Sequence, residues 1–267
     1  MAKGTTHKLI LILKQLAYTG AAVAVQQVAK ATGLTVATTY RLLQTLVDEG
    51  VAAYDPVNRQ YGLGSESVSI AAAILGSDSL IGRVRPIVRR LADELTETCS
   101  FSMLDQATLT HVVVVVERGP HALGYEYDAG RRDPLHAGAS GKVMLAFLPD
   151  KDIDDYLKRG NLKKLTPQTV TEPAKLRAQI KAIRNCGYGL SRAERIPGQG
   201  RGVAVPVFSV KGRIAGSLVI TTPVFRFKQG RLPKIVQMMQ KAAAELAGFT
   251  DAALASTKVA QVAGARR

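Results

Sequence analysis

The 267-residue sequence has no tryptophan, only two cysteines and only four histidines. Two cysteines are too few for the disulfide framework of a small secreted protein, and Cys99 and Cys186 are not spaced as a metal knuckle. We therefore expect both to be buried, neutral thiols. The histidines are widely scattered, so the sequence predicts no zinc site, and no cofactor is expected.

Long apolar segments are also missing. No uninterrupted apolar run approaches the roughly 20 residues that a membrane-spanning helix needs, and the N-terminus lacks the basic, apolar and small-residue regions of a secretory signal. These absences predict a cytoplasmic protein that has no membrane partner.

Acidic residues are scarce relative to basic ones. The chain has 21 Asp and Glu against 36 Lys and Arg, a formal net charge of +15, which favours a polyanion or anionic small molecules as partners. Residues 1–64 hold six basic and three acidic residues, or +3, whereas residues 65–267 hold 30 and 18, or +12. With 46% hydrophobic residues the chain is neither disordered nor fibrous, and its length predicts two domains.

The first 64 residues have the pattern of a DNA-reading unit. Apolar residues at helical spacing predict helices over residues 8–18 and 25–32, and a Gly33-Leu34 turn separates the second from a third helix that Thr35 caps and Gly50 ends. Two short β-type runs, 51–54 and 60–63, follow as a hairpin. Three helices and a hairpin in this order predict a winged helix-turn-helix.

The third helix carries side chains that can read DNA. Arg41 can hold a phosphate or pair with guanine, Gln44 can read adenine, and threonine hydroxyls can donate to phosphates. An arginine in the hairpin turn can enter a minor groove. The predicted DNA-contacting residues are Thr35, Val36, Ala37, Thr38, Tyr40, Arg41 and Gln44 on the helix, with Asn58 and Arg59 in the wing. A nonspecific architectural DNA-binding protein remains an alternative.

The rest of the chain mixes helices and strands, which predicts an α+β sheet domain. Helices are expected over 65–76 and 79–98, where Pro86 should kink or restart the second, then over 140–147, 150–158, 173–185 and 232–246. Strands are expected over 100–104, 109–118, 123–127, 203–208 and 214–221. The predicted domains are a DNA-binding domain over residues 1–64, linker helices over 65–99, a ligand-binding and oligomerisation domain over 100–250 and a tail over 251–267.

Several longer segments resemble one known family. They are VAKATGLTVATTYRLLQTLVDEGV from Val28 in the head, YGLG from Tyr61, GRVRPIVRRLADELTET from Gly82, LHAGASGKVMLAFLP from Leu135 and GVAVPV from Gly202. In order and spacing they resemble the IclR family of bacterial transcription regulators, over about residues 8–246. The resemblance implies a winged-helix head, a linker helix used in dimer contacts and a GAF-like effector-binding domain. It also implies homodimers or homotetramers on palindromic double-stranded operators, acting as repressors or activators.

The sequence departs from the family at three places. Val36-Ala37-Thr38 stands where a basic residue, serine and threonine are common. Gly202 stands where a cysteine is often found, and Ser191 where an acidic residue is.

The resemblance also implies an effector pocket. The positions that match the family's effector contacts are Ala139, Ser140, Ser191, Gly202, Val219 and Thr221. Independently, Gly138, Ser140 and Gly141 open a helix whose free N–H groups and dipole attract an anion. Met103 and Tyr125 are expected either on the apolar side of the pocket or in the core. Without the acid and the cysteine we expect a roomier pocket and a larger, apolar or aromatic, organic acid as effector.

An enzyme is the rival interpretation. His136, Ser140 and Glu194 can be cast as base, nucleophile and orienting acid of a serine hydrolase-like site, and Asp152, Asp154 and Asp155 as paired carboxylates. The serine is misplaced for a Gly-x-Ser-x-Gly elbow, however, and the aspartates fit a solvated helix face. The sequence therefore predicts a DNA-binding regulator and not an enzyme.

Overall fold

The computed structural model describes residues 4–76, 79–121, 128–159, 162–198 and 200–247, and the chain divides into two compact units, residues 1–76 and 77–267. The expected strand at 123–127 and the expected tail lie outside the described residues. No single helix of the described part is long and apolar enough to cross a membrane. Within that part, only the helices Ser65–Leu75 and Leu80–Leu95 taken together, across a sharp bend, reach that length and composition.

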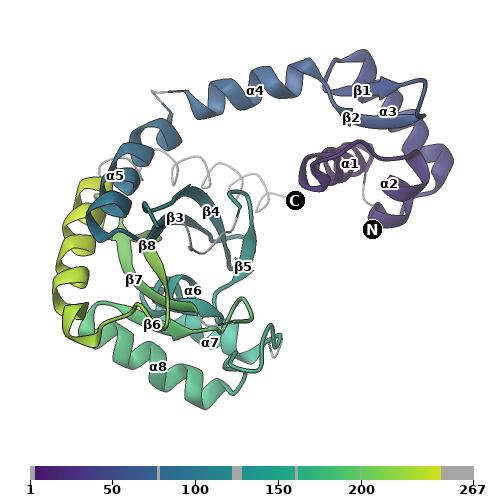
Figure 1. The fold of residues 1–267 in the computed structure, drawn as a ribbon. Coiled ribbons are helices and arrows are strands. Elements are labelled where there is room, and N and C mark those ends of the chain that lie inside the picture. Colours follow the sequence, from purple (N-terminus) through teal and green to yellow (C-terminus); the bar gives the residue numbers. More distant parts are fainter. Residues whose placement is uncertain (1–3, 77–78, 122–127, 160–161, 199, 248–267) are drawn as a thin grey trace. The chain divides into compact units, whose positions relative to one another are not determined.

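The first unit is a winged helix-turn-helix (Figure 1). Its elements are α1 (Thr5–Thr19), α2 (Val25–Thr32), α3 (Val36–Asp48), the antiparallel strands β1 (Ala52–Asp55) and β2 (Gln60–Leu63), and α4 (Ser65–Leu75). Buried apolar side chains from all three leading helices, such as Ile12, Val28 and Leu43, form its core. One feature was not predicted: Val23 forms two backbone hydrogen bonds with Tyr61, of 2.9 and 2.8 Å, which ties the α1–α2 connection to the hairpin.

The second unit is built on a six-stranded sheet with helices on both faces. In chain order its elements are α5 (Leu80–Leu95), β3 (Thr98–Asp105), β4 (Thr110–Glu117), β5 (Arg132–Pro134), α6 (Gly138–Ala146), α7 (Asp150–Lys158), α8 (Pro173–Cys186), β6 (Gly189–Arg192), β7 (Gly200–Phe208), β8 (Ile214–Pro223), a 3-10 turn η1 (Gln229–Arg231) and a helix over residues 232–247.

The sheet has the strand order β5-β4-β3-β8-β7-β6, and every neighbouring pair is antiparallel. Because side chains alternate along a strand, Val203 and Val205 pack on one face with α5 and the helix over 232–247. Ala204 and Val219 pack on the opposite face with side chains of α6, α7 and α8. Figure 1 shows these helices on the side of the sheet away from α5. The predicted α+β class is confirmed.

The structure bears on the expectations for Pro86 and for the two cysteines. α5 runs through Pro86 as one helix, so the proline does not restart it. Cys99 is buried, and burial raises the pKa of its thiol, as expected of an inert core cysteine. Cys186 is exposed, which corrects the expectation of two buried thiols: it ends α8, whose inward side chains are Leu176, Ile180 and Ile183.

Candidate functional site

The exposed face of α3 holds most of the side chains predicted to contact DNA. The exposed residues are Thr35, Val36, Ala37, Tyr40, Arg41 and Gln44, and Thr38 is half-buried. Val36 and Tyr40 are 46% and 53% exposed, unusually accessible for large apolar groups. The opposite face, with Leu42 and Leu43, packs in the core and fixes the helix, while its polar and aromatic face is exposed to solvent.

Hydrogen bonds at the start of α3 fix its two predicted hydroxyls. Thr35 Oγ1 accepts from the Thr38 backbone N–H at 3.2 Å and lies 2.9 Å from Thr38 Oγ1, to which it donates. The Thr38 hydroxyl keeps its own proton and can still donate to a phosphate. Further along, Gln44 Nε2 donates to Asp48 at 3.0 Å, so reading a base with Gln44 requires giving up that bond.

The wing is shaped by one aspartate. Asp55 accepts hydrogen bonds from the backbone of Val57 and Asn58 and from the Asn58 amide at 2.6 Å, and these bonds hold the pKa of its carboxyl below the usual value. Asn58 is therefore engaged in the turn itself. Arg59 is exposed with a left-handed φ of 53°, and Val57 at the tip is 87% exposed, an exposure that the sequence pattern did not single out.

The arginines of α5 are engaged within the second unit. Arg85 and Arg89 pair with Glu117 at 3.6 and 3.3 Å, and Arg90 pairs with Glu245 at 2.6 Å. These three arginines thus have acidic partners within their own unit, and their side chains remain partly exposed to solvent.

A pocket of the second unit brings the predicted effector positions together. It is a small cavity of about 50 Å³ that opens to solvent, and it lies between the start of α6, the segment after β6, and the strands β7 and β8. Six residues expected from the sequence line it: Ala139, Ser140, Ser191, Gly202, Val219 and Thr221. Residues outside the positions matched to the family's effector contacts also line it: Ala137, Gly138, Ala193, Glu194, Arg195, Ile196 and Gly200.

The floor of the pocket is a row across three strands. Ser191 on β6 is the register partner of Gly202 on β7, and Gly202 is the partner of Thr221 on β8. Among the described residues neither flanking hydroxyl has a hydrogen-bond partner. A Cβ at Gly202 would lie only 2.8 Å from Ser191 Oγ. The serine therefore fills space that a larger residue at 202 would need.

The remaining hydroxyl of the pocket is tied to the sheet. Ser140 Oγ lies 2.7 Å from Ser217 Oγ on β8, and both residues are buried. This bond fixes the start of α6, all of whose residues are buried, against the strand that supplies Val219 and Thr221. The pocket is thus built on rigid elements.

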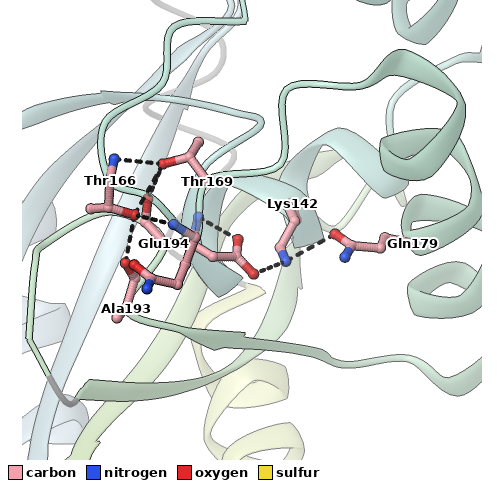
Figure 2. A network of polar contacts seen from close by, with 8 residues as sticks. Lys142, Thr166, Thr169, Gln179, Ala193 and Glu194 are labelled. Atoms are coloured by element: carbon pink, nitrogen blue, oxygen red, sulfur yellow. Dashed lines mark hydrogen bonds and ion pairs between the residues drawn. The ribbon is translucent and has the colours of Figure 1, made fainter.

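The start of α6 already holds a carboxylate of the chain itself. Glu194 Oε2 accepts from the Gly138 backbone N–H at 3.2 Å, and Glu194 Oε1 lies 2.6 Å from Lys142 Nζ, which also donates to Gln179 (Figure 2). Gly138 has a φ of +81°, which favours glycine at this turn into the helix. The expectation of an open anion site at this helix end is therefore corrected, because Glu194 occupies its first N–H.

Two threonine hydroxyls bind the backbone of Ala193 and Glu194, which line the pocket. Thr166 Oγ1 donates to the Ala193 carbonyl at 2.7 Å and Thr169 Oγ1 donates to the Glu194 carbonyl at 2.6 Å (Figure 2). Both threonines are buried, so these bonds anchor the backbone on either side of the Glu194 side chain.

Arg195 links the pocket to a second buried acid. Its guanidinium, 13% exposed, donates to Asp133 at 2.7 Å, and Arg131 donates to the same carboxylate at 3.0 Å. Burial alone raises the pKa of Asp133, but the charge of Arg195 and the hydrogen bonds of Arg131 outweigh it and lower the pKa below the usual value. Arg195 brings positive potential to the pocket wall.

Two predicted lining residues do not come to the pocket. Met103 lies two residues after Phe101 and four after Cys99 on β3, so all three side chains point to the same face of the sheet. Met103 therefore packs on the α5 face, away from α6. Tyr125 lies outside the described residues.

The residues considered for a hydrolase do not form a triad. In the neutral form of the buried His136, Nε2 donates to the Lys163 carbonyl at 3.0 Å and Nδ1 accepts from the Tyr156 hydroxyl at 2.9 Å. Burial lowers its pKa accordingly. Ser140 bonds to Ser217 instead. Of the three candidate aspartates, which all lie on α7, Asp154 pairs with Arg177 at the surface.

Comparison with known proteins identifies both units. The model of the IclR helix-turn-helix domain matches residues 5–56, and the model described as "Bacterial transcriptional regulator IclR C-terminal" matches residues 72–247. The chain is 29% identical to the HTH-type transcriptional regulator BhcR of Paracoccus denitrificans over 82% of this chain and 78% of that protein. It is 27% identical to the transcriptional repressor IclR of Escherichia coli, over 88% and 85%.

Solved structures share the fold. An IclR transcriptional regulator from Alicyclobacillus acidocaldarius superposes with a TM-score of 0.84 at 21% identity, covering 94% of this chain and all of that one. An IclR homologue from Microbacterium hydrocarbonoxydans, solved in complex with 4-hydroxybenzoate, gives 0.77 at 19% identity, covering 93% of this chain and all of that one.

Proposed function

The chain belongs to the IclR family of bacterial transcriptional regulators, and from that premise we propose that α3 and the β1–β2 wing bind specific operators under the control of a small organic acid in the pocket. The proposal of DNA binding rests on the exposed face of α3, which presents polar and aromatic side chains while the opposite face of the helix is packed in the core. Named repressors among the relatives favour repression as the outcome of operator binding.

Arg41→Ala tests the DNA interface. Because Arg41 is exposed on α3 and can bind a guanine edge or a phosphate, we expect its loss to weaken operator binding about tenfold or more. The measurement is fluorescence anisotropy with an operator enriched from genomic DNA by binding selection. Lys14→Ala, which removes the same charge from the exposed side of α1, is the control and should change affinity little.

The competing DNA prediction has a distinct outcome. A nonspecific architectural binder would hold random duplex as tightly as the selected palindrome in a competition assay, and Arg41→Ala would weaken both equally. Equal competition by random duplex at physiological salt would therefore overturn the operator proposal.

The proposal of an acid ligand rests on the Ser191-Gly202-Thr221 floor, whose two hydroxyls have no hydrogen-bond partner among the residues that the structure describes and lie in the same pocket as Arg195. A structural relative was solved with an aromatic acid, 4-hydroxybenzoate, and we propose an acid of this kind for the present pocket. We expect acid binding and operator binding to be thermodynamically coupled. An acid that binds one arrangement of the units in a dimer more tightly than another shifts the fraction of dimers able to bind DNA.

Gly202→Val should weaken acid binding tenfold or more, because the added side chain enters the pocket floor where even a Cβ meets Ser191. Calorimetric titration with a panel of aromatic and aliphatic acids measures the effect. Arg213→Ala, which removes an exposed side chain of the same unit that does not line the pocket, should leave binding intact. Binding by neutral or cationic compounds alone would show that the acid proposal is wrong.

We further propose that α4 pairs with α4 of a second copy. Although α4 is mostly apolar, it buries no residue, and Val68, Ile70, Ile74 and Leu75 are 48–65% exposed. A single helix seldom presents such a surface to water unless a partner covers it. A two-fold symmetric dimer also matches a palindromic operator.

Val68→Glu/Leu75→Glu tests this interface. The two positions lie seven residues apart on one helix face, so the charges should separate the dimer and lower operator affinity. Light scattering on a sizing column measures the mass. Tyr18→Glu adds charge at a 63% exposed apolar site on α1 and should leave the dimer intact. A double variant that stays dimeric would place the interface elsewhere.

A further inference from the structure

The pocket wall contains an acceptor whose capacity is not fully used. Among the described residues, each carboxylate oxygen of Glu194 has one partner: Lys142 Nζ at 2.6 Å for Oε1 and the Gly138 N–H at 3.2 Å for Oε2. An ionised carboxylate can accept about four hydrogen bonds. Because Glu194 lines the pocket, its remaining acceptor positions are available to a ligand there.

Glu194 is held in place when a ligand enters. Lys142 is 2% exposed and does not line the pocket, so the Glu194 carboxylate stands between it and any ligand. Displacing Glu194 would leave a buried ammonium group without its counter-charge, which is strongly unfavourable. The Thr166 and Thr169 hydroxyls also fix the backbone on both sides of the carboxylate (Figure 2). A ligand must therefore bind beside Glu194 and cannot take its place.

The pocket wall at Glu194 and the pocket floor consequently favour different functional groups of a ligand. Next to Glu194 a second carboxylate is repelled, whereas a hydroxyl can donate to Glu194 in a charge-assisted hydrogen bond. At the floor, Ser191 and Thr221 supply hydroxyl donors, and Arg195 supplies positive potential. These groups suit a single carboxylate.

From this arrangement we propose that Glu194 determines ligand specificity: the effector is a monocarboxylic acid that also carries a hydroxyl group, and the hydroxyl donates to Glu194. The proposal rests on the proposed function of the pocket as an acid site. It excludes dicarboxylic acids, and acids without a donor bind more weakly.

The test is calorimetric titration of the full-length protein with matched probes. They are benzoate and its 2-, 3- and 4-hydroxy derivatives, propionate and lactate, and the dicarboxylates terephthalate and malonate. We expect at least one hydroxy acid to bind about tenfold or more tightly than its unsubstituted partner, the usual range for a hydrogen bond to a charged group. We expect the dicarboxylates not to bind measurably.

A paired variant separates charge from packing. Lys142→Met/Glu194→Gln removes both charges together, so no buried charge is left alone. In this variant the preference for the hydroxy acid should fall severalfold, and the dicarboxylates should gain affinity. Lys175→Met/Glu172→Gln removes an exposed ion pair, at 2.7 Å, and should change neither property.

The outcomes distinguish the two proposals. If none of the acids binds the wild-type protein, the acid pocket itself is wrong. If acids bind but hydroxy and unsubstituted partners bind equally, or a dicarboxylate binds best, the acid pocket stands and the role of Glu194 is overturned. Unchanged selectivity in the folded double variant also overturns it. Should the double variant not fold, the wild-type comparison alone decides.

Discussion

Lys142→Met should lower the free energy of unfolding of the second unit by about 3 kcal/mol, the lower end of the range for breaking a buried ion pair. Lys142 is 2% exposed and its ammonium lies 2.6 Å from Glu194, so the substitution leaves the carboxylate with the Gly138 N–H as its one partner in the described part of the chain. The lower end applies because Glu194 also borders the pocket, where water can reach it.

Restoring neutrality should restore stability. In Lys142→Met/Glu194→Gln both charges are gone, and we expect unfolding within about 1 kcal/mol of wild type. The exposed pair supplies the control, since Lys175→Met should cost about 0–1 kcal/mol. Urea unfolding followed by circular dichroism suits a protein without tryptophan. A Lys142→Met variant as stable as Lys175→Met would mean that the buried pair does not stabilise the fold.

Acidification should destabilise the second unit through His111. Its side chain is fully buried, both ring nitrogens lack partners among the described residues, and burial lowers its pKa to about 4. The nearby Asp133 opposes this shift, and Arg195 and Arg131 reinforce it. The folded imidazole therefore stays neutral down to about pH 4.

The sign of the pH dependence follows from proton binding. Below about pH 6.5 the unfolded chain binds a proton at His111 that the folded chain does not, so stability falls as the pH is lowered from 6.5 to 4. The loss should approach about 3 kcal/mol, since each pKa unit corresponds to about 1.4 kcal/mol. Burial lowers the pKa of His136 as well, which adds a change of the same sign. The pKa of Asp133 is lowered in the folded protein, so protonation of this carboxylate reduces stability only in more acid solution.

His111→Leu should remove most of this slope. The leucine matches Leu104, the cross-strand neighbour of His111, and replaces polar atoms that have no partner, so stability at pH 7 should be nearly unchanged. His121→Leu, at an exposed position, is the matched control. Urea unfolding at a series of pH values measures both. A His111→Leu variant that loses as much stability as wild type between pH 6.5 and 4 would show that another group controls the acid response.

Sequence patterns predicted the local elements better than the contacts between them. The third helix and its threonine cap were read from residue types at helical spacing, and the structure confirms that element. The floor residues Ser191, Gly202 and Thr221 followed from the resemblance, and the structure places them in one row, although their role with a ligand stays a prediction.

The remaining features depend on long-range placement. Glu194 caps a helix that begins 56 residues earlier, and no local pattern announces that bond. β4 contains five consecutive valines, so its sequence does not show which side chains face α6, nor the irregularity opposite Phe101 and Ser102. Alternation along β3 groups Met103 with Phe101, but only the fold shows that α6 packs on the other face.

The two cysteines have an experimental consequence. Cys99 is shielded in the core, whereas Cys186 meets solvent at the end of α8. A maleimide dye should therefore attach at one known point per chain, without engineering. Resonance energy transfer between dyes on two copies would then report directly whether adding an acid changes the spacing of their second units.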